Sequence, residues 1–204
     1  MSRVPAGSIT NTGKEGTRRL PRGERRQSIL DGATHAFARA GFAATSMPEI
    51  AEASGITPII VYRHFESKEV LYRATLDCVC SRLTTQLEAG KEPGGFGIGA
   101  GSVLAAARHD PDGFRLLWRH AAREPLFSTY AAGLREWAVS TAQNSMDDRV
   151  PAEALQWAAH AVVGYLVEAV LNWLEFGDER RDVLFVKATN TAMRAGVKVW
   201  SETG

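Results

Sequence analysis

One stretch, residues 46–65, constrains the fold of this 204-residue chain most strongly, because it predicts two short helices joined by a tight turn. Ser46 and Glu49 have the S-x-x-E spacing of a capping box at the start of the first helix. Gly55 follows the apolar positions of that helix, where a helix end favours a residue that tolerates positive φ. Thr57-Pro58 then fits the N-cap and first residue of a second helix. This is a helix-turn-helix pattern, whose second helix can enter a DNA major groove.

The second helix of this pattern is predicted to have one buried and one outward face. At 100° per residue, Val61 and Phe65 point to one side, and Ile59 and Arg63 point to the other. Outward isoleucines fit contacts with thymine methyl groups or sugar carbons, while an outward arginine fits a guanine edge or a phosphate. The alternative is that Ile59 or Ile60 packs against a neighbouring helix. The outward residues are Ile59, Ile60, Tyr62 and Arg63.

A longer pattern surrounds the two helices and covers about a quarter of the chain. Its residues are Ile29, Ala33, Phe37, Gly41-Phe42, Thr45-Ser46, Ile50-Ala51, Ala53, Gly55-Ile56, Val61-Tyr62-Arg63-His64-Phe65, Ser67-Lys68-Glu69 and Leu71. With this pattern, the segment from Arg26 to Leu71 resembles the DNA-binding domain of TetR-family transcriptional regulators. It departs from the family at Ile59 and Ile60, where small or hydroxylated residues are usual. That departure concerns the operator sequence and leaves the expected fold unchanged.

The expected DNA contacts combine this resemblance with helix geometry. Lys68 begins a predicted fourth helix, where its ammonium and the free amides could meet one phosphate. Tyr62 and His64 match family positions that contact the DNA backbone, and Thr45-Ser46 would offer amides at the start of the second helix. The expected DNA-binding residues are Thr45, Ser46, Thr57, Pro58, Ile59, Ile60, Tyr62, Arg63, His64 and Lys68.

The formal net charge of +1 hides an asymmetry, since residues 1–26 carry +5 and the remaining chain carries −4. A basic arm on a slightly acidic body suits a protein that touches DNA with one end. A solubilising disordered tail would have the same composition. We therefore expect a flexible basic arm over 1–20, a helix-turn-helix DNA-binding domain over 21–67, and a helical ligand-binding and dimerisation domain over 68–204.

No strand pattern occurs, so an all-α protein is expected, with a three-helix head and a larger helical body. The first helix should run from Pro21 or Gly23 to Ala40 and stop at Gly41. The glycine-rich stretch 91–101 predicts a break, and it lacks the G-K-[ST] ending of a phosphate-binding loop. The other expected helices cover 68–89, 102–109, 112–122, 124–146, 151–176 and 181–200.

The helix over 151–176 is so apolar that it is expected to be buried nearly all round. It and the last helix carry more apolar surface than one chain needs. In the family that the chain resembles, the last two helices pair with their copies in a four-helix interface, so a homodimer is expected. Gly164 would allow close approach of a neighbouring helix.

Aromatic and polar residues in the body suggest an apolar cavity with a few polar groups. In the resembling family this domain binds an inducer, so we expect an apolar, aromatic or polycyclic effector with one polar end. Core packing is the alternative for each aromatic residue. The candidate ligand-binding residues are Trp118, Trp137, Trp157, His160, Tyr165 and Glu168.

Catalytic and metal-binding patterns such as H-E-x-x-H and G-x-S-x-G do not occur, so no enzyme activity, cofactor or metal is expected. Cys78 and Cys80 are expected to be core residues of a cytosolic protein rather than a disulfide. The start lacks an apolar signal region, and no segment is expected to span a membrane. The sequence thus predicts a cytoplasmic, ligand-responsive repressor of a palindromic operator. The alternative is an all-α ligand-binding protein or enzyme with an incidental helix-turn-helix.

Overall fold

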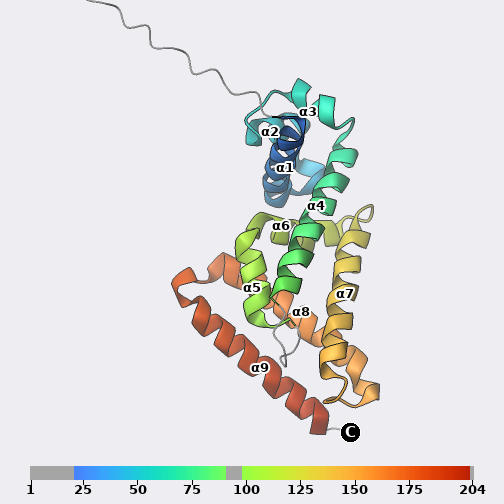
Figure 1. The fold of residues 1–204 in the computed structure, drawn as a ribbon, viewed down its shortest axis with the longest axis vertical. Coiled ribbons are helices and arrows are strands. Elements are labelled where there is room, and N and C mark those ends of the chain that lie inside the picture. The colour runs from blue at the N-terminus through green and yellow to red at the C-terminus, as the bar shows by residue number, and fades with distance from the viewer. Residues whose placement is uncertain (1–20, 91–97, 203–204) are drawn as a thin grey trace, which may run out of the picture.

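The computed structural model describes residues 21–90 and 98–202. Throughout these ranges the chain forms helices, turns and short connections without a strand, which confirms the all-α prediction (Figure 1). The expected basic arm over 1–20, and residues 91–97 of the glycine-rich break, lie outside the described residues.

Three helices form the head at one end of the molecule: α1 (Arg22–Ala44), α2 (Met47–Ala53) and α3 (Pro58–His64). Gly41 interrupts α1 as predicted, because its backbone has φ +77° and ψ 175°, but helical residues resume up to Ala44. Helical spacing predicts one buried stripe through Ile29, Ala33, Ala36, Phe37 and Ala40; the first four are buried, but Ala40 is exposed. Ala40 lies directly before the interruption at Gly41, where the regular helical stripe ends.

The turn between α2 and α3 forms as its residues predict. The Ser46 amide donates to Glu49 Oε2 at 2.7 Å, and the Ser46 hydroxyl accepts from the Glu49 amide, so the capping box is complete. Gly55 takes φ +65° after the end of α2. Thr57 occupies the N-cap of α3 without a side-chain cap bond, and Pro58 follows as its first residue.

Helix α4 (Lys68–Ala89) runs from the head into the body, as its predicted range requires (Figure 1). Tyr72 of α4 packs in an edge-on contact with Phe37 of α1, with ring centroids 4.7 Å apart. Phe42 and Phe127 complete an aromatic cluster at the junction, with their centroids 5.0 Å apart. Because Phe127 directly precedes α7, this cluster joins the head to the body.

The body contains α5 (Ala100–His109), α6 (Pro111–Arg115), α7 (Ser128–Met146), α8 (Ala152–Phe176) and α9 (Asp182–Glu202). Asp110 caps α6 by accepting from the Gly113 amide at 2.8 Å, as the Asp-Pro pair predicts. The single helix expected over 112–122 is instead divided. The π-helical turn η1 (Leu116–His120) and the 3₁₀ turn η2 (Ala121–Arg123) follow α6, and η3 (Glu179–Arg181) precedes α9.

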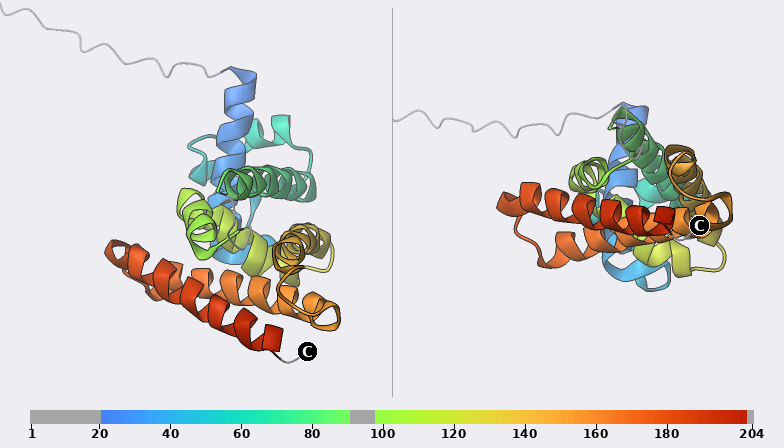
Figure 2. Two further views of the ribbon diagram at one scale, coloured as in Figure 1. Left: turned by 60° about the horizontal axis from the view of Figure 1, so that its bottom comes forward. Right: turned by 90° about the horizontal axis from the view of Figure 1, so that it is seen from below.

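Helices α8 and α9 lie side by side at the end of the body opposite the head (Figure 2). The expectation that α8 is buried nearly all round is wrong. One side packs on α5 and α7, while Trp157, Tyr165 and Phe176 on other sides are exposed. By length and composition alone, α8 is long and apolar enough to cross a membrane, whereas we expected that no segment would qualify. Half of that apolar stretch is buried inside the protein, and the core helix of a soluble protein has the same length and apolar composition.

Candidate functional site

The outward face of α3 has the arrangement that helical periodicity predicts. Val61 and Phe65 are buried in the head core. Ile59 is 62% exposed and Tyr62 is 54% exposed, and Arg63 is also exposed. Ile60 is half-buried. Packing against a neighbouring helix therefore does not account for Ile59, whereas Ile60 is partly covered within the head.

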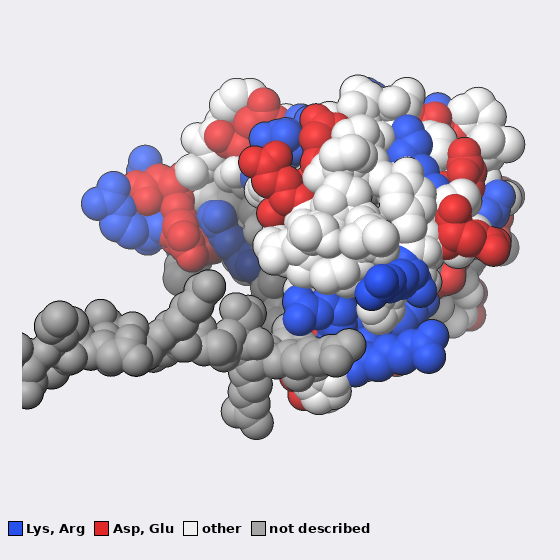
Figure 3. Space-filling model, turned by 90° about the horizontal axis from the view of Figure 1, so that it is seen from above, with Lys and Arg blue, Asp and Glu red and all other residues white. Residues whose placement is uncertain are grey.

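Arginines from the start of α1 lie next to the end of α3. Burial lowers the pKa of His64, and the nearby charges of Arg22, Arg26 and Arg25 lower it further. The Arg26 guanidinium stands 5.0 Å from the centre of the Phe65 ring. Figure 3 looks at this end of the molecule, where an uncharged area is bordered by basic side chains on one side and by acidic side chains on others. The end of α3 thus has positive charge beside it from the arginines at the start of α1.

The two predicted contacts before α2 are already hydrogen-bonded within the head, Thr45 as a buried residue and Ser46 as an exposed one. The Thr45 hydroxyl is buried and donates to the carbonyl oxygen of Gly41 at 2.7 Å. Ser46 uses both its amide and its hydroxyl to bind the Glu49 carboxylate, and these hydrogen bonds lower the pKa of Glu49. The start of α2 therefore presents a carboxylate where the sequence suggested a free amide. Thr57 and Pro58, at the start of α3, are exposed.

The ammonium of Lys68 is likewise engaged inside the head. Its Nζ donates to the carbonyl oxygens of Phe42 at 2.8 Å and Thr45 at 3.0 Å, and lies 3.5 Å from that of Ala43. It also stands 4.4 Å from the centre of the Phe42 ring. The last carbonyls of a helix lack intrahelical partners, so a cation at this position satisfies them. This geometry joins the start of α4 to the end of α1 instead of leaving a free cation.

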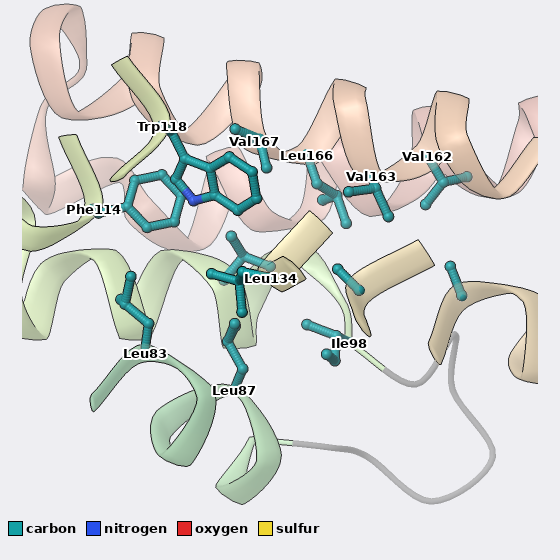
Figure 4. A pocket seen from close by; sticks show the side chains of 13 residues that line it. Leu83, Leu87, Ile98, Phe114, Trp118, Leu134, Val162, Val163, Leu166 and Val167 are labelled. Atoms are coloured by element: carbon teal, nitrogen blue, oxygen red, sulfur yellow. The ribbon is translucent and has the colours of Figure 1, made fainter. Parts of the chain in front are cut away.

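A narrow cavity lies inside the body between α4, α5, α6, η1, α7 and α8 (Figure 4). Its volume is about 40 Å³, enough for a few water-sized groups. The indole N–H of Trp118 is the one side-chain polar group in its lining. The lining residues are Leu83, Leu87, Ile98, Val103, Phe114, Trp118, Leu134, Ala138, Ala142, Val162, Val163, Leu166 and Val167.

Of the six residues that the sequence suggested for a ligand site, Trp118 lines this cavity and the other five do not. Trp157 lies outside and packs edge-on against Trp200 of α9, with centroids 5.0 Å apart. Tyr165 lines a separate surface groove between α8 and α9. His160 and Glu168 are exposed on α8, and Trp137 is half-buried on α7 outside the lining.

The aliphatic lining could have been recognised from the period of α8. Val162, Val163, Leu166 and Val167 repeat at helical spacing on one side, while His160 and Glu168 fall on the other side. The ionisable residues therefore indicated the outer face of α8. Most of the predicted aromatic residues lie outside the pocket, because the pocket is built mainly of Leu, Ile and Val.

The π-helical turn η1 joins this cavity to the head. Trp118 lines the cavity, and His120, two residues later, donates from Nε2 to the carbonyl oxygen of Ala38 on α1 at 3.0 Å. A Cβ at Gly41 would stand 3.0 Å from His120 Nδ1, so the ring rests directly on the interruption in α1. π-helical turns are often found at functional positions. Movement of Trp118 would therefore reach the head through a short and well-packed segment.

A histidine–carboxylate hydrogen bond and two ion pairs reinforce the same junction. His35 Nδ1 of α1 lies 2.8 Å from Asp112 Oδ2 of α6. Arg82 of α4 binds both Asp31 of α1 and Asp110 before α6, each at 2.9 Å. These contacts connect α1, α4 and α6, so the head and body are held together by charged groups as well as by aromatic packing.

Groups of three or more potential metal ligands are absent from residues 21–90 and 98–202. Cys78 and Cys80 are free, as expected, but they are half-buried and pack against the core rather than lying inside it. Burial, aided by Asp77, raises the pKa of Cys80 to about 11, so this thiol stays protonated near neutral pH.

Comparison with known proteins identifies the head. A family model described as bacterial regulatory proteins, tetR family, matches residues 29–75. The HTH-type transcriptional activator FasR of Mycolicibacterium smegmatis is 45% identical over 58 residues, which are 28% of this chain and 26% of FasR. An HTH-type transcriptional repressor of Mycobacterium tuberculosis is 40% identical over 74 residues, 35% of this chain and 39% of the repressor. These alignments thus span between a quarter and two fifths of each relative, and both names describe regulators rather than enzymes.

The fold comparison extends over most of the chain. A TetR-like transcriptional regulator from Rhodococcus sp. RHA1 superposes with a TM-score of 0.74 at 20% identity. The superposition covers 88% of this chain and 98% of that one, so the head and the helical body share its architecture. Residues 29–75 thus match the tetR family of bacterial regulatory proteins, and the helical architecture of the chain is similar to that of a TetR-like transcriptional regulator.

Proposed function

We propose that the protein is a cytoplasmic, homodimeric repressor that binds a palindromic DNA operator and is released by a small apolar effector. The observation that carries this proposal is the outward face of α3, which is exposed, contains Ile59, Tyr62 and Arg63, and has basic side chains beside it. A helix with such a face fits the major groove, and the neighbouring arginines suit the phosphates.

Contacts with DNA divide into two groups under this proposal. Thr57, Pro58, Ile59 and Ile60 begin α3, and the first residues of a recognition helix are those that reach base edges. Arg63 suits a guanine edge, since it is exposed and makes no ion pair with the described residues. Tyr62, His64 and the arginines of α1 suit phosphate groups.

Dimerisation is supported by the outer surface of α8 and α9. Large apolar side chains there are exposed in the single chain: Trp157, Tyr165, Phe176, Val183, Leu184 and Val199. Extended exposed apolar surface marks interaction sites in soluble proteins. Since the two helices lie side by side, two copies would form a four-helix interface and hold the two heads at one spacing.

The effector proposal rests on the cavity. Its lining of Leu, Val, Ile and Ala with one indole N–H suits a mainly hydrocarbon molecule with at most one acceptor group. Because the volume is about 40 Å³, a ligand of usual size would have to push helices apart. Such a ligand prefers a different conformation and shifts the population toward it, and η1 would carry that change to α1.

Selection of duplexes from a random DNA library tests the DNA-binding proposal, because it requires no chosen operator sequence. We expect an enriched inverted repeat, and Arg63→Ala should relax the choice of base at one position of each half-site, at a cost of about 1–3 kcal/mol there. Failure of the folded protein to enrich any sequence would contradict the proposal. The selected duplex is called the operator below.

A cavity-filling variant tests control by an effector. Replacing Ala138, which lines the cavity, by Phe would mimic an occupied site and should weaken operator binding without an added ligand. Ala132→Phe, at an exposed position of the same helix, is the control. Unchanged operator affinity in a folded Ala138→Phe protein would contradict coupling. In a promoter–operator reporter, the wild-type protein should lower expression, and a rise would identify an activator.

A further inference from the structure

The side chain of Ile59 is the least explained feature of the head. It is the second residue of α3, it is 62% exposed, and it lies on the side opposite Val61. An isoleucine has no hydrogen-bonding group, so it can neither bind a phosphate nor donate to a base. Its side chain is too exposed to contribute to the packing of the head core. Its position at the start of α3 therefore calls for an apolar partner outside the protein.

We propose that Ile59 recognises the C5-methyl group of a thymine in each half-site of the operator. This inference rests on the proposed function, and it names the base chemistry that the site selects. In the major groove, thymine alone presents a methyl group, while the other base edges present donors and acceptors. Ile59 placed against those polar edges would remove water from them without replacing its hydrogen bonds. Thymine is therefore the base that gains from this contact.

The neighbouring residue on the same face sets the register. Arg63 lies four residues after Ile59, which is about 6 Å along a helix. Successive base pairs are about 3.4 Å apart along the DNA axis. If Arg63 binds a guanine, this offset corresponds to about two base pairs between that guanine and the thymine read by Ile59. Each half-site then contains a thymine and a guanine in close succession.

The test replaces single thymines of the operator by uracil, which removes only the methyl group and keeps the pairing and the O4 acceptor. The wild-type protein should bind about threefold to fivefold more weakly when the contacted thymine in one half-site is replaced, as loss of one apolar methyl contact implies. Ile59→Ala should bind the thymine and uracil duplexes equally. Leu126→Ala removes a similarly exposed aliphatic side chain, 68% exposed, from the connection before α7 and should behave as wild type.

Two results would overturn the inference while leaving the proposed function intact. The first is sequence-specific binding by the wild-type protein with no uracil effect at any thymine. The second is a uracil effect that persists unchanged in Ile59→Ala, which would assign the methyl contact to another residue. A folded wild-type protein that binds no duplex with sequence preference would instead contradict both proposals together.

Discussion

At the scale of single residues, Lys68 illustrates how a side chain that is placed correctly along the chain can have partners within the protein that the sequence does not show. It begins α4 as its sequence context predicts, next to Ser67, whose hydroxyl accepts from the Val70 amide. The sequence could not reveal that the end of α1 lies within reach. Because the chain folds back there, Nζ meets the carbonyl oxygens of Phe42 and Thr45.

Replacing Lys68 by Ala should therefore act mainly on the head itself. Loss of charge-assisted bonds to carbonyls of the α1 end should lower the free energy of unfolding by about 1–3 kcal/mol. Urea denaturation measures this change. The salt dependence of operator binding should stay close to that of the wild type. A slope reduced by about one unit per subunit would instead support the phosphate contact that the sequence suggested.

His64 gives a second prediction at the same scale, on pH. Its pKa in the free protein lies below the ordinary value of 6.5, because burial and then Arg22, Arg26 and Arg25 disfavour the charged ring. A bound phosphate would offset those charges and raise the pKa, so binding takes up a proton. Operator affinity should therefore increase as pH falls through the region near and below 6.5. His64→Gln should lose this dependence, and a pH-independent wild type would argue against a phosphate at His64.

At the scale of secondary-structure elements, local chemistry determined which features could be predicted. The capping box at Ser46, the turn at Gly55 and the cap at Asp110 depend on neighbouring residues, and all three are present. The division of 111–123 into α6, η1 and η2 depends on packing against α1 and on the His120 contact, which no local pattern encodes. For the same reason the cavity residues contributed by separate helices could not be assembled from the sequence.

Replacing Gly41 tests whether the interruption in α1 requires glycine. Its φ of +77° with ψ of 175° is essentially restricted to glycine, and a Cβ there would press on His120 Nδ1. Gly41→Ala should lower the free energy of unfolding by about 1–3 kcal/mol in denaturant titrations. Gly23→Ala is the matched control, because Gly23 lies in the same helix with open space around it. A Gly41→Ala protein as stable as the control would show that this backbone geometry is not required.

At the scale of the whole molecule, the exposed faces of α8 and α9 define the expected subunit contact. The apolar composition of α8 was evident from the sequence, but the single chain covers only one of its sides. The total hydropathy of α8, taken without its helical period, does not separate residues that meet the body core from residues that would meet a second subunit. The contrast between buried Val163 and exposed Tyr165 makes that separation.

Gly164 offers a sharp test of this contact. A Cβ at Gly164 would meet nothing within 4 Å in the single chain, and the same holds for Gly133 on α7. Gly164→Leu should therefore leave the subunit fold intact but obstruct close approach of a second copy, so analytical ultracentrifugation should show more monomer. Gly133→Leu should remain a dimer. Equal association of both variants would place the interface elsewhere.

Under the proposed function, one dimer holds two recognition helices at a fixed spacing and binds both half-sites together. Two heads related by C2 symmetry reach half-sites about 34–36 Å apart, which is one helical turn of DNA. The most direct measurement is the affinity of the protein for the operator after insertion of about five base pairs, half a helical turn, between the half-sites. Affinity should fall to that of a duplex carrying one half-site. Affinity equal to that of the unmodified operator would show that the heads bind independently and would contradict this proposal.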